Sequence, residues 1–213
     1  MKPKLLDLFC CQGGATKGLQ KAGFYVVGVD INPQPRYCGD EFIQADAMEV
    51  SLDGFDAYWA SPPCQCYTMA GQQWRGEGRE YPDLVAPTRD RLKETGKPYI
   101  IENVIGAPLI DPIMLNGGMF GMNLRRRRLF ECSFENPVFL LPSEPPSNFR
   151  MSRKPRKHDP VVPVGHFSGV DRAKKVMGID WMDQYGLTQA IPPAYSEFLG
   201  RQMLAAMGAS RCI

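Results

Sequence analysis

Four short apolar runs alternate with segments of helical pattern in the first half of the chain, and this alternation constrains the fold more than any other feature of the sequence. The runs cover residues 5–9, 25–29, 55–60 and 98–101. Strands that alternate with helices are typical of an α/β domain with a doubly wound parallel sheet. Ligands bind to such sheets at the carboxyl ends of the strands. Because glycine or polar residues follow each run at that end, we expect the functional residues to gather there.

Helical patterns predict helices over residues 14–20, 83–95, 171–177 and 194–207. Two other segments have no clear period. Residues 65–82 form a loop longer than compact domains usually contain, which is typical of a mobile lid or a disordered insert. Residues 136–163 are rich in proline, serine and basic side chains, and they predict a small appended lobe or an ordered loop.

The composition fits one globular domain that folds inside the cell. The 213 residues are 44% hydrophobic and 23% charged. No run of about 18 apolar residues could cross a membrane. The seven cysteines form an odd set without a Cys-x-x-Cys pair. They therefore predict neither a disulfide framework nor a metal site, and they favour a reducing, cytoplasmic environment.

The net charge of +2 says almost nothing about partners, but the basic residues are unevenly distributed. Arginines fill positions 125–128, and a second basic cluster lies between residues 150 and 158. Such clusters are most often solvated faces or flexible loops, and contact with nucleic acid is the alternative.

Glycines and an aspartate follow the first two apolar runs. Gly13 and Gly14 allow close approach of the backbone to a ligand and present amides at a helix start, which suits a nucleotide or a carboxylate. With Gly18 they do not match the dinucleotide pattern Gly-x-Gly-x-x-Gly, which disfavours a nicotinamide enzyme. Asp30 could accept hydrogen bonds from a ribose, or it could simply cap a turn or helix.

Cys64 follows two prolines at the end of the third apolar run. The prolines stiffen the turn, so the thiol is held in place as a nucleophile requires. A cysteine is nevertheless more often a small buried apolar residue. Cys66 lies two residues further on and is a rival nucleophile.

A carboxyl and two guanidiniums complete the set of candidate residues. Glu102 follows the fourth apolar run and could donate a proton beside a nucleophile on a neighbouring strand, or it could cap a helix or pair with an arginine. Arg126 and Arg128 alternate in an extended segment and so share a face. They suit a carbonyl oxygen or phosphates, unless they are only surface charge.

The order and content of these motifs resemble those of the cytosine-5 DNA methyltransferase family. Residues 7–14 resemble its opening motif, 63–65 its Pro-Cys-Gln signature, 102–104 its Glu-Asn-Val motif, 126–128 its Arg-x-Arg motif and 189–193 its closing motif. The resemblance implies a doubly wound, Rossmann-like α/β fold of the class I AdoMet-dependent methyltransferases, with a small target-recognition lobe.

S-adenosyl-L-methionine (AdoMet) is the cofactor that this resemblance implies. The residues expected to bind it are Phe9, Cys11, Gly13, Gly14, Asp30, Ile31, Asp46, Pro63 and Gln189. The resemblance also divides the chain into a catalytic domain of residues 1–132 completed by 170–213, and a reduced recognition lobe or loop of residues 133–169.

Four departures from the family pattern affect the cofactor site and target recognition. Cys11 replaces a glycine, Leu124 replaces a glutamine, and Thr188-Gln189 replaces Gly-Asn. The interval after Arg128 is also short, so a reduced lobe, the 65–82 loop or a partner must recognise the target.

The implied substrate is double-stranded DNA with a cytosine flipped out of the helix. Cys64 would attack carbon 6, Glu102 would assist at ring nitrogen 3, Arg128 would hold the carbonyl oxygen, and Arg126 would support the site. The basic cluster between residues 150 and 158 would contact phosphates.

Three alternatives come from other classes. The substrate could be a tRNA cytosine, or the chain could be a catalytically inactive nucleic-acid-binding module. An AdoMet enzyme acting on small molecules would leave Cys64, Glu102 and Arg128 without a joint task.

Overall fold

The structure confirms the strands and helices that the apolar runs predict and adds several shorter elements. The computed structural model describes residues 1–68, 81–135, 140, 141, 143, 156 and 158–209. The strands are β1 (Lys4–Leu8), β2 (Tyr25–Asp30), β3 (Glu41–Gln44), β4 (Ala57–Ala60), β5 (Tyr99–Asn103), β6 (Ile113–Leu115) and β7 (Arg128–Cys132). The helices are α1 (Gly14–Ala22), α3 (Val85–Glu94), α4 (Val170–Met177), α5 (Gln184–Gln189), α6 (Pro193–Ala209) and the short 3-10 helix η1 (Gly117–Phe120).

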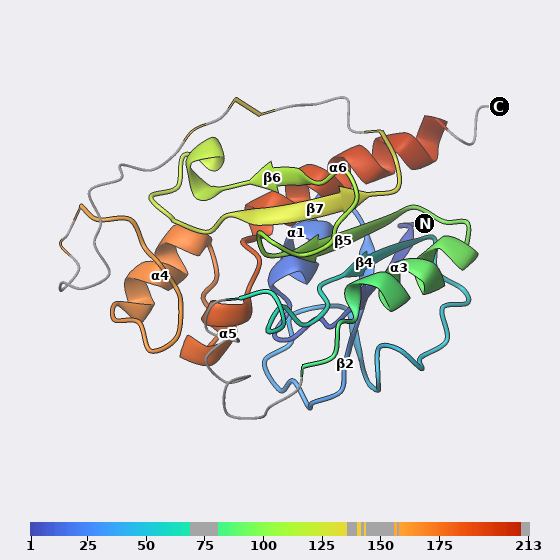
Figure 1. Ribbon diagram of the computed structural model, residues 1–213, viewed down its shortest axis with the longest axis horizontal. Helices are drawn as coiled ribbons and strands as arrows, with labels where there is room; N and C mark the ends of the chain where they lie inside the picture. Colours follow the sequence, from blue (N-terminus) through green and yellow to red (C-terminus); the bar gives the residue numbers. More distant parts are fainter. Residues whose placement is uncertain (69–80, 136–139, 142, 144–155, 157, 210–213) are drawn as a thin grey trace.

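These strands form one seven-stranded sheet in the order β3-β2-β1-β4-β5-β7-β6 (Figure 1). The pairs among β1 to β5 are parallel, whereas β7 runs antiparallel to both β5 and β6. The predicted α/β class is confirmed, but the expectation of a purely parallel sheet is wrong at this edge. The chain passes from β6 to β7 through η1 without a crossover helix, so β7 returns antiparallel.

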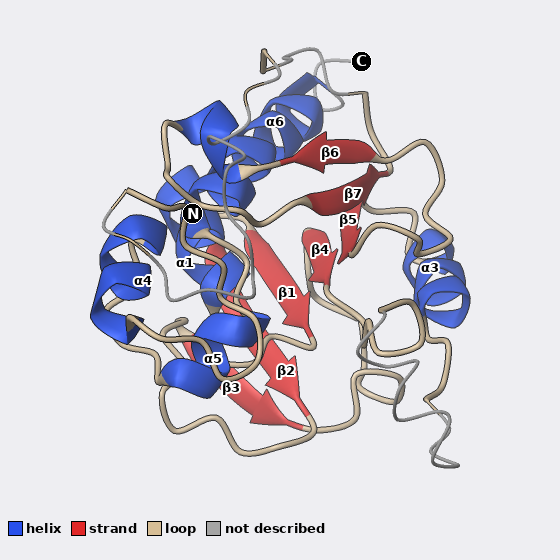
Figure 2. Ribbon diagram, turned by 60° about the vertical axis from the view of Figure 1, so that its left-hand side comes forward, coloured by secondary structure: helices blue, strands red, loops and turns tan. Residues whose placement is uncertain are grey.

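Helices cover both faces of the sheet, which explains why the strands are continuous apolar runs. Leu5 packs with Leu19 of α1 and Leu199 of α6, whereas its neighbour Leu6 packs with Leu92 of α3 on the other face. Figure 2 shows α1 and α6 on one side of the sheet and α3 on the other. The carboxyl ends of the parallel strands remain as the edge where a site can open.

Gly18 lies where α1 crosses α6, and its missing side chain lets the two helices touch. A Cβ atom on Gly18 would lie 2.1 Å from both the carbonyl oxygen of Pro193 and the Oγ of Ser196. We expect Gly18→Ala to lower the free energy of unfolding by about 1–3 kcal/mol, the cost of overpacking, in urea denaturation. In the control Gly208→Ala, the new Cβ meets no atom within 4 Å, so stability should hold or rise slightly. Equal stability of the two variants would contradict this close contact.

A third apolar cluster lies beside the main core and joins segments that are far apart in the sequence. It contains Leu124, Val161, Ala173, Met177, Ile179, Met182, Leu187 and Ala190. Leu124 and Val161 also form a parallel bridge. The end of the 133–169 segment therefore packs on α4 and α5. The division into residues 1–132 with 170–213 and a separate lobe stays a prediction, since residues 144–155 lie outside the described part.

Two predicted features fall largely on undescribed residues. These are the proposed lid at 65–82, where residues 69–80 are not described, and the basic cluster between 150 and 158. Among the residues that are described, no helix is long and apolar enough to cross a bilayer. The same residues contain no group of three or more His, Cys, Asp or Glu side chains that could hold a metal ion.

Candidate active site

The turn after β4 holds Cys64 at the carboxyl edge of the sheet, as the sequence predicts. The Nδ2 of Asn103, at the end of β5, donates a hydrogen bond to the carbonyl oxygen of Pro62 at 3.0 Å. The amide of Ser61 donates to the carbonyl oxygen of Leu8 at 3.1 Å. Strands β5 and β1 therefore hold the turn from both sides, and the position of the thiol depends on buried backbone contacts.

Glu102 ends β5, next to β4, and forms an ion pair with Arg128 of β7. The Nε of Arg128 lies 3.1 Å from the Oε1 of Glu102, and the two side chains are 17% and 8% exposed. Burial raises the pKa of Glu102, while Arg128, then Arg126, and a hydrogen bond from Ser61 oppose this rise. Glu102 therefore pairs with an arginine, which is one of the alternatives that the sequence left open. It also keeps its proton more readily than an exposed glutamate.

The thiol of Cys64 is half-buried and responds to the same three charged groups. Burial raises its pKa most, Glu102 raises it further, and Arg128 and Arg126 lower it. The thiol, the carboxyl and both guanidiniums are therefore within electrostatic reach of one another. Such a group can act as a nucleophile once the arginines or a bound substrate favour the thiolate. Cys66 lies on the same turn and stays a rival nucleophile.

Arg126 is buried at 3% exposure and serves a different purpose from Arg128. Its Nη1 donates to the carbonyl oxygen of Pro163 at 3.2 Å and its Nη2 to that of Thr188 at 2.7 Å. Its own carbonyl oxygen accepts from the hydroxyl of Tyr195 at 2.8 Å. Arg126 therefore connects the start of β7 to α5 and α6 and positions the site.

The loop between β1 and α1 has a left-handed backbone at three positions. The φ angles are 61° at Phe9, 46° at Cys11 and 84° at Gly13. Glycine adopts this conformation without strain, whereas Phe9 and Cys11 are strained by roughly 1–3 kcal/mol each. The left-handed backbone at position 11 explains why the motif that this loop resembles has a glycine there. With Cys11 in its place, the loop is strained in this chain.

Asp30, at the end of β2, fixes this loop from the neighbouring strand. Its Oδ2 accepts from the amide of Cys11 at 3.0 Å and its Oδ1 from the amide of Asn32 at 2.9 Å. The aspartate thus caps local backbone amides. Each oxygen keeps a second lone pair, so a ribose could still be bound.

The C-terminal part of the chain closes over the same loop. The indole Nε1 of Trp181 donates to the carbonyl oxygen of Gln12 at 2.8 Å, and the Nε2 of Gln12 donates to the Oδ1 of Asp183 at 3.1 Å. A Cβ on Gly14 would lie 2.7 Å from the carbonyl oxygen of Ile191. The opening and closing motifs are therefore in contact. The sequence pattern did not indicate Gln12, Trp181 or Asp183, because their contacts span about 170 residues.

The other predicted cofactor residues lie around the ends of β1 to β4. Ile31 is 63% exposed beside Asp30. Asp46 follows β3, where its Oδ1 accepts from the amide of Met48 at 2.8 Å. Pro63 is half-buried beside Cys64, and Gln189 is exposed at the end of α5. The residues thus border one edge of the sheet, on four neighbouring strands and α5.

A buried acceptor below the loop indicates what kind of ligand fits. Asp7 is 1% exposed, and its Oδ2 accepts from the hydroxyl of Thr16 at 2.5 Å. Its Oδ1 is buried and has no hydrogen-bond partner within the described residues. Burial raises the pKa of Asp7 to about 7, since the hydrogen bond from Thr16 offsets burial only in part and Asp30 raises the pKa further. The carboxyls of Asp7 and Asp30, at the ends of neighbouring strands, fit a ligand with a cationic centre and a ribose, as AdoMet has.

Comparisons with known proteins agree with this fold. No family model and no curated protein matches the chain. A candidate DNA modification methyltransferase encoded within a prophage (E. coli) is similar in structure, with 14% identity and a TM-score of 0.64 over 97% of this chain and 99% of that chain. The S. pombe Dnmt2 methyltransferase is similar with 12% identity and a TM-score of 0.61, over 96% of this chain and 99% of that chain.

A third solved structure, the Entamoeba histolytica methyltransferase EhMeth, covers 99% of both chains with 13% identity and a TM-score of 0.62. At these identities the likeness establishes the fold. The chain has the Rossmann-like α/β fold of the class I methyltransferases, as its sequence predicts.

Proposed function

We propose that this chain is an AdoMet-dependent DNA (cytosine-5-)-methyltransferase with Cys64 as its nucleophile. The observation that carries the proposal is the convergence of Cys64, Glu102 and Arg128 at the ends of β4, β5 and β7, where the charges of the last two alter the pKa of the thiol. A thiol, a protonatable carboxyl and a guanidinium are the groups needed to activate a pyrimidine ring. The likeness to a candidate DNA modification methyltransferase and to two other methyltransferases supports the same reaction class.

AdoMet, when bound, supplies an electrophilic methyl group. The residues proposed to hold it are Phe9, Cys11, Gly13, Gly14, Asp30, Ile31, Asp46, Pro63 and Gln189. The amides at the start of α1 suit its carboxylate, and Asp30 suits its ribose. The contacts of Gln12 with Trp181 and Asp183 keep the loop in position from the other side.

Cytosine carbon 5 is a weak nucleophile, and Cys64, Glu102 and Arg128 together would make it reactive. The Cys64 thiolate adds to carbon 6 while Glu102 delivers its proton to ring nitrogen 3, which makes carbon 5 an enamine carbon able to accept the methyl group. Loss of the carbon 5 proton to water, return of the nitrogen 3 proton to Glu102 and elimination of the Cys64 thiolate then restore the aromatic ring. The Nη2 of Arg128 makes no hydrogen bond within the described residues, so it can donate to the cytosine carbonyl oxygen.

The substrate base has to leave the duplex before this chemistry, because carbon 6 is inaccessible inside the base stack. Flipping the base out costs about a few kcal/mol in lost stacking and pairing. The ion pair between Glu102 and Arg128 fixes both side chains at the edge of the sheet, where the flipped base would bind.

Transfer of a labelled methyl group tests the proposal directly. Incubation of the full chain with labelled AdoMet and duplex DNA should place the label in DNA, and mass spectrometry should identify the product nucleoside as 5-methylcytosine. Label in tRNA but not in DNA would replace the proposed substrate with RNA. Label in neither, with binding of nucleic acid retained, would make the chain an inactive binding module.

A further inference from the structure

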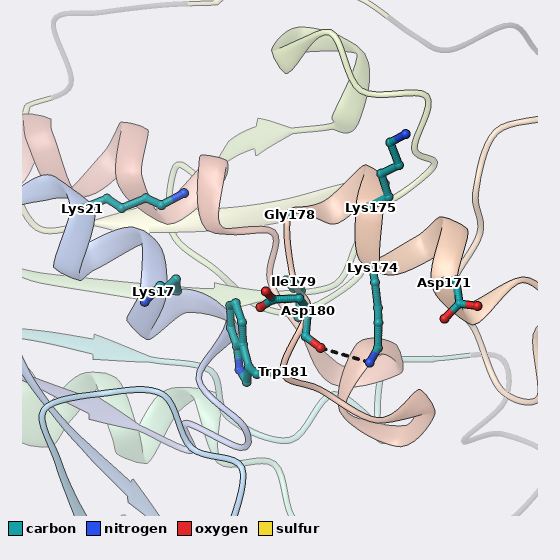
Figure 3. A pocket seen from close by; sticks show the side chains of 9 residues that line it. All are labelled: Lys17, Lys21, Asp171, Lys174, Lys175, Gly178, Ile179, Asp180 and Trp181. Carbon is teal, nitrogen blue, oxygen red and sulfur yellow. Dashed lines mark hydrogen bonds between the residues drawn. The ribbon is translucent and has the colours of Figure 1, made fainter.

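A groove lined by lysines lies between α1 and α4 (Figure 3), and its lining includes none of Cys64, Glu102 and Arg128. Lys17 and Lys21 of α1 line one wall, and Lys174 and Lys175 of α4 line the other. Trp181 lies between them, and the groove has a volume of about 500 Å³. We call this feature the lysine groove. Nothing in the catalytic chemistry requires four ammonium groups at this position.

The lysine groove has an excess of positive charge that the described residues do not neutralise. Two carboxylates, Asp171 and Asp180, face four lysines. None of these lysines forms an ion pair with a carboxylate anywhere in the described residues. Lys174 instead donates to the carbonyl oxygen of Asp180 at 3.0 Å. Four lysines against two carboxylates leave a net positive charge along the groove, and this charge favours a bound anion.

The arrangement of these charges favours a polymer of phosphates over a small anion. The lysines project from two helices and line the groove at several points along it, and Lys17 and Lys21 lie one helical turn, or about 6 Å, apart. Lysine ammoniums act as mobile point charges, which suits the repeated phosphates of a nucleic-acid strand. The Trp181 ring already attracts a cation, with Lys17 Nζ 5.9 Å from its centroid. That contact holds Lys17 beside the Trp181 ring.

The lysine groove is also linked to the loop between β1 and α1. Trp181, which forms part of the groove, donates its indole hydrogen bond to the carbonyl oxygen of Gln12, directly before Gly13. A strand bound in the groove would therefore lie beside the loop that borders the candidate active site. We propose that the lysine groove binds the phosphate backbone of the nucleic-acid substrate outside the catalytic centre. This inference rests on the proposed function.

Removal of the two exposed lysines tests the inference. Lys21 and Lys175 make no ion pair or ring contact in the described residues, so Lys21→Ala/Lys175→Ala should fold normally, as a thermal melt can verify. Fluorescence anisotropy with a labelled duplex oligonucleotide should show an affinity about 10-fold lower or more at 0.1 M salt. The slope of log K against log salt should fall by about two, one for each lost phosphate contact.

Matched variants make this measurement specific. Lys93→Ala/Lys97→Ala removes the same charge from exposed positions in and after α3, on the far side of the sheet, and should leave affinity and slope unchanged. Lys21→Arg/Lys175→Arg should keep wild-type affinity, since the charge is retained. Equal affinity and slope for Lys21→Ala/Lys175→Ala and the wild type would overturn the inference. Loss of binding to anionic lipid vesicles alone, with unchanged oligonucleotide affinity, would overturn it too.

A parallel measurement separates this inference from the proposed function. Covalent trapping of the wild-type chain on a 5-fluorocytosine oligonucleotide with AdoMet reports the chemistry without reference to the groove. If the wild type is trapped and the double alanine variant binds DNA as the wild type does, the inference about the lysine groove is wrong and the proposed methyltransferase function stands. If the wild type is not trapped, the proposed function is wrong, whatever the salt dependence of binding.

Discussion

Replacing Cys64 with alanine should abolish methyl transfer, with kcat/KM at least about 10⁴-fold lower, the scale seen when a covalent nucleophile is removed. The fold should survive, because Asn103 and Ser61 hold the turn through backbone atoms and not through the thiol. A 5-fluorocytosine oligonucleotide with AdoMet makes the result visible on a denaturing gel. Fluorine at carbon 5 cannot leave as a cation, so the adduct with the nucleophilic sulfur persists.

The rival thiol supplies the control for that experiment. Cys66 follows Cys64 on the same turn, and Cys66→Ala should still form the trapped adduct. An adduct that survives Cys64→Ala and disappears in Cys66→Ala would transfer the nucleophile to Cys66. An adduct in both variants would show that the reaction does not require Cys64, and the proposed mechanism would then fail.

The positions of Cys64 and Glu102 were predictable because they depend on local patterns. An apolar run that ends in polar residues places those residues at a strand end, and the structure puts the run at 98–101 in β5 (Tyr99–Asn103). The run at 25–29 likewise becomes β2 (Tyr25–Asp30). What the sequence could not show was that β4 and β5 are neighbours, since strand order is set by the whole sheet.

Strand β7 shows why other elements escaped prediction. It contains Glu131, a buried charged residue next to the strand's last position, which interrupts the apolar run. Both carboxylate oxygens of Glu131 accept from Arg89 of α3 at 2.7 Å. A buried charge is tolerable when it is paired in this way, but the partner is 42 residues away, and no local pattern connects the two.

Arg126 and Arg128 illustrate how one motif separates into two tasks. Alternation in an extended segment predicted that both would face one cleft. In the structure β7 begins only at Arg128, which pairs with Glu102, whereas Arg126 precedes the strand and bonds to the carbonyl oxygens of Pro163 and Thr188. The carbonyl partners come from a segment folded back from the C-terminal part, so the positioning task of Arg126 depends on tertiary structure alone.

Replacing Glu102 with glutamine should lower methyl transfer by about 10²–10⁴-fold, the usual contribution of a positioned general acid. Glutamine keeps the shape and can donate a hydrogen bond to ring nitrogen 3, but it has no proton to deliver. Because burial raises the pKa of Glu102, the acid form persists to higher pH than in an exposed glutamate, and the wild-type rate should fall as pH rises through that pKa. The variant should lose this dependence.

The same substitution should change the Cys64 thiol in the opposite sense, and this contrast identifies the role of Glu102. Glu102 is the second cause of the raised pKa of Cys64, after burial, so its removal leaves Arg128 and Arg126 to lower that pKa. Alkylation of Cys64 by iodoacetamide, followed by mass spectrometry in a Cys66→Ser background, should therefore be faster in Glu102→Gln at neutral pH. Glu49→Gln, at an exposed position, is the matched control and should alter neither measurement. Faster alkylation with slower methyl transfer means that the proton of Glu102 matters more than its charge. Unchanged methyl transfer in Glu102→Gln would show that Glu102 is only a structural partner of Arg128.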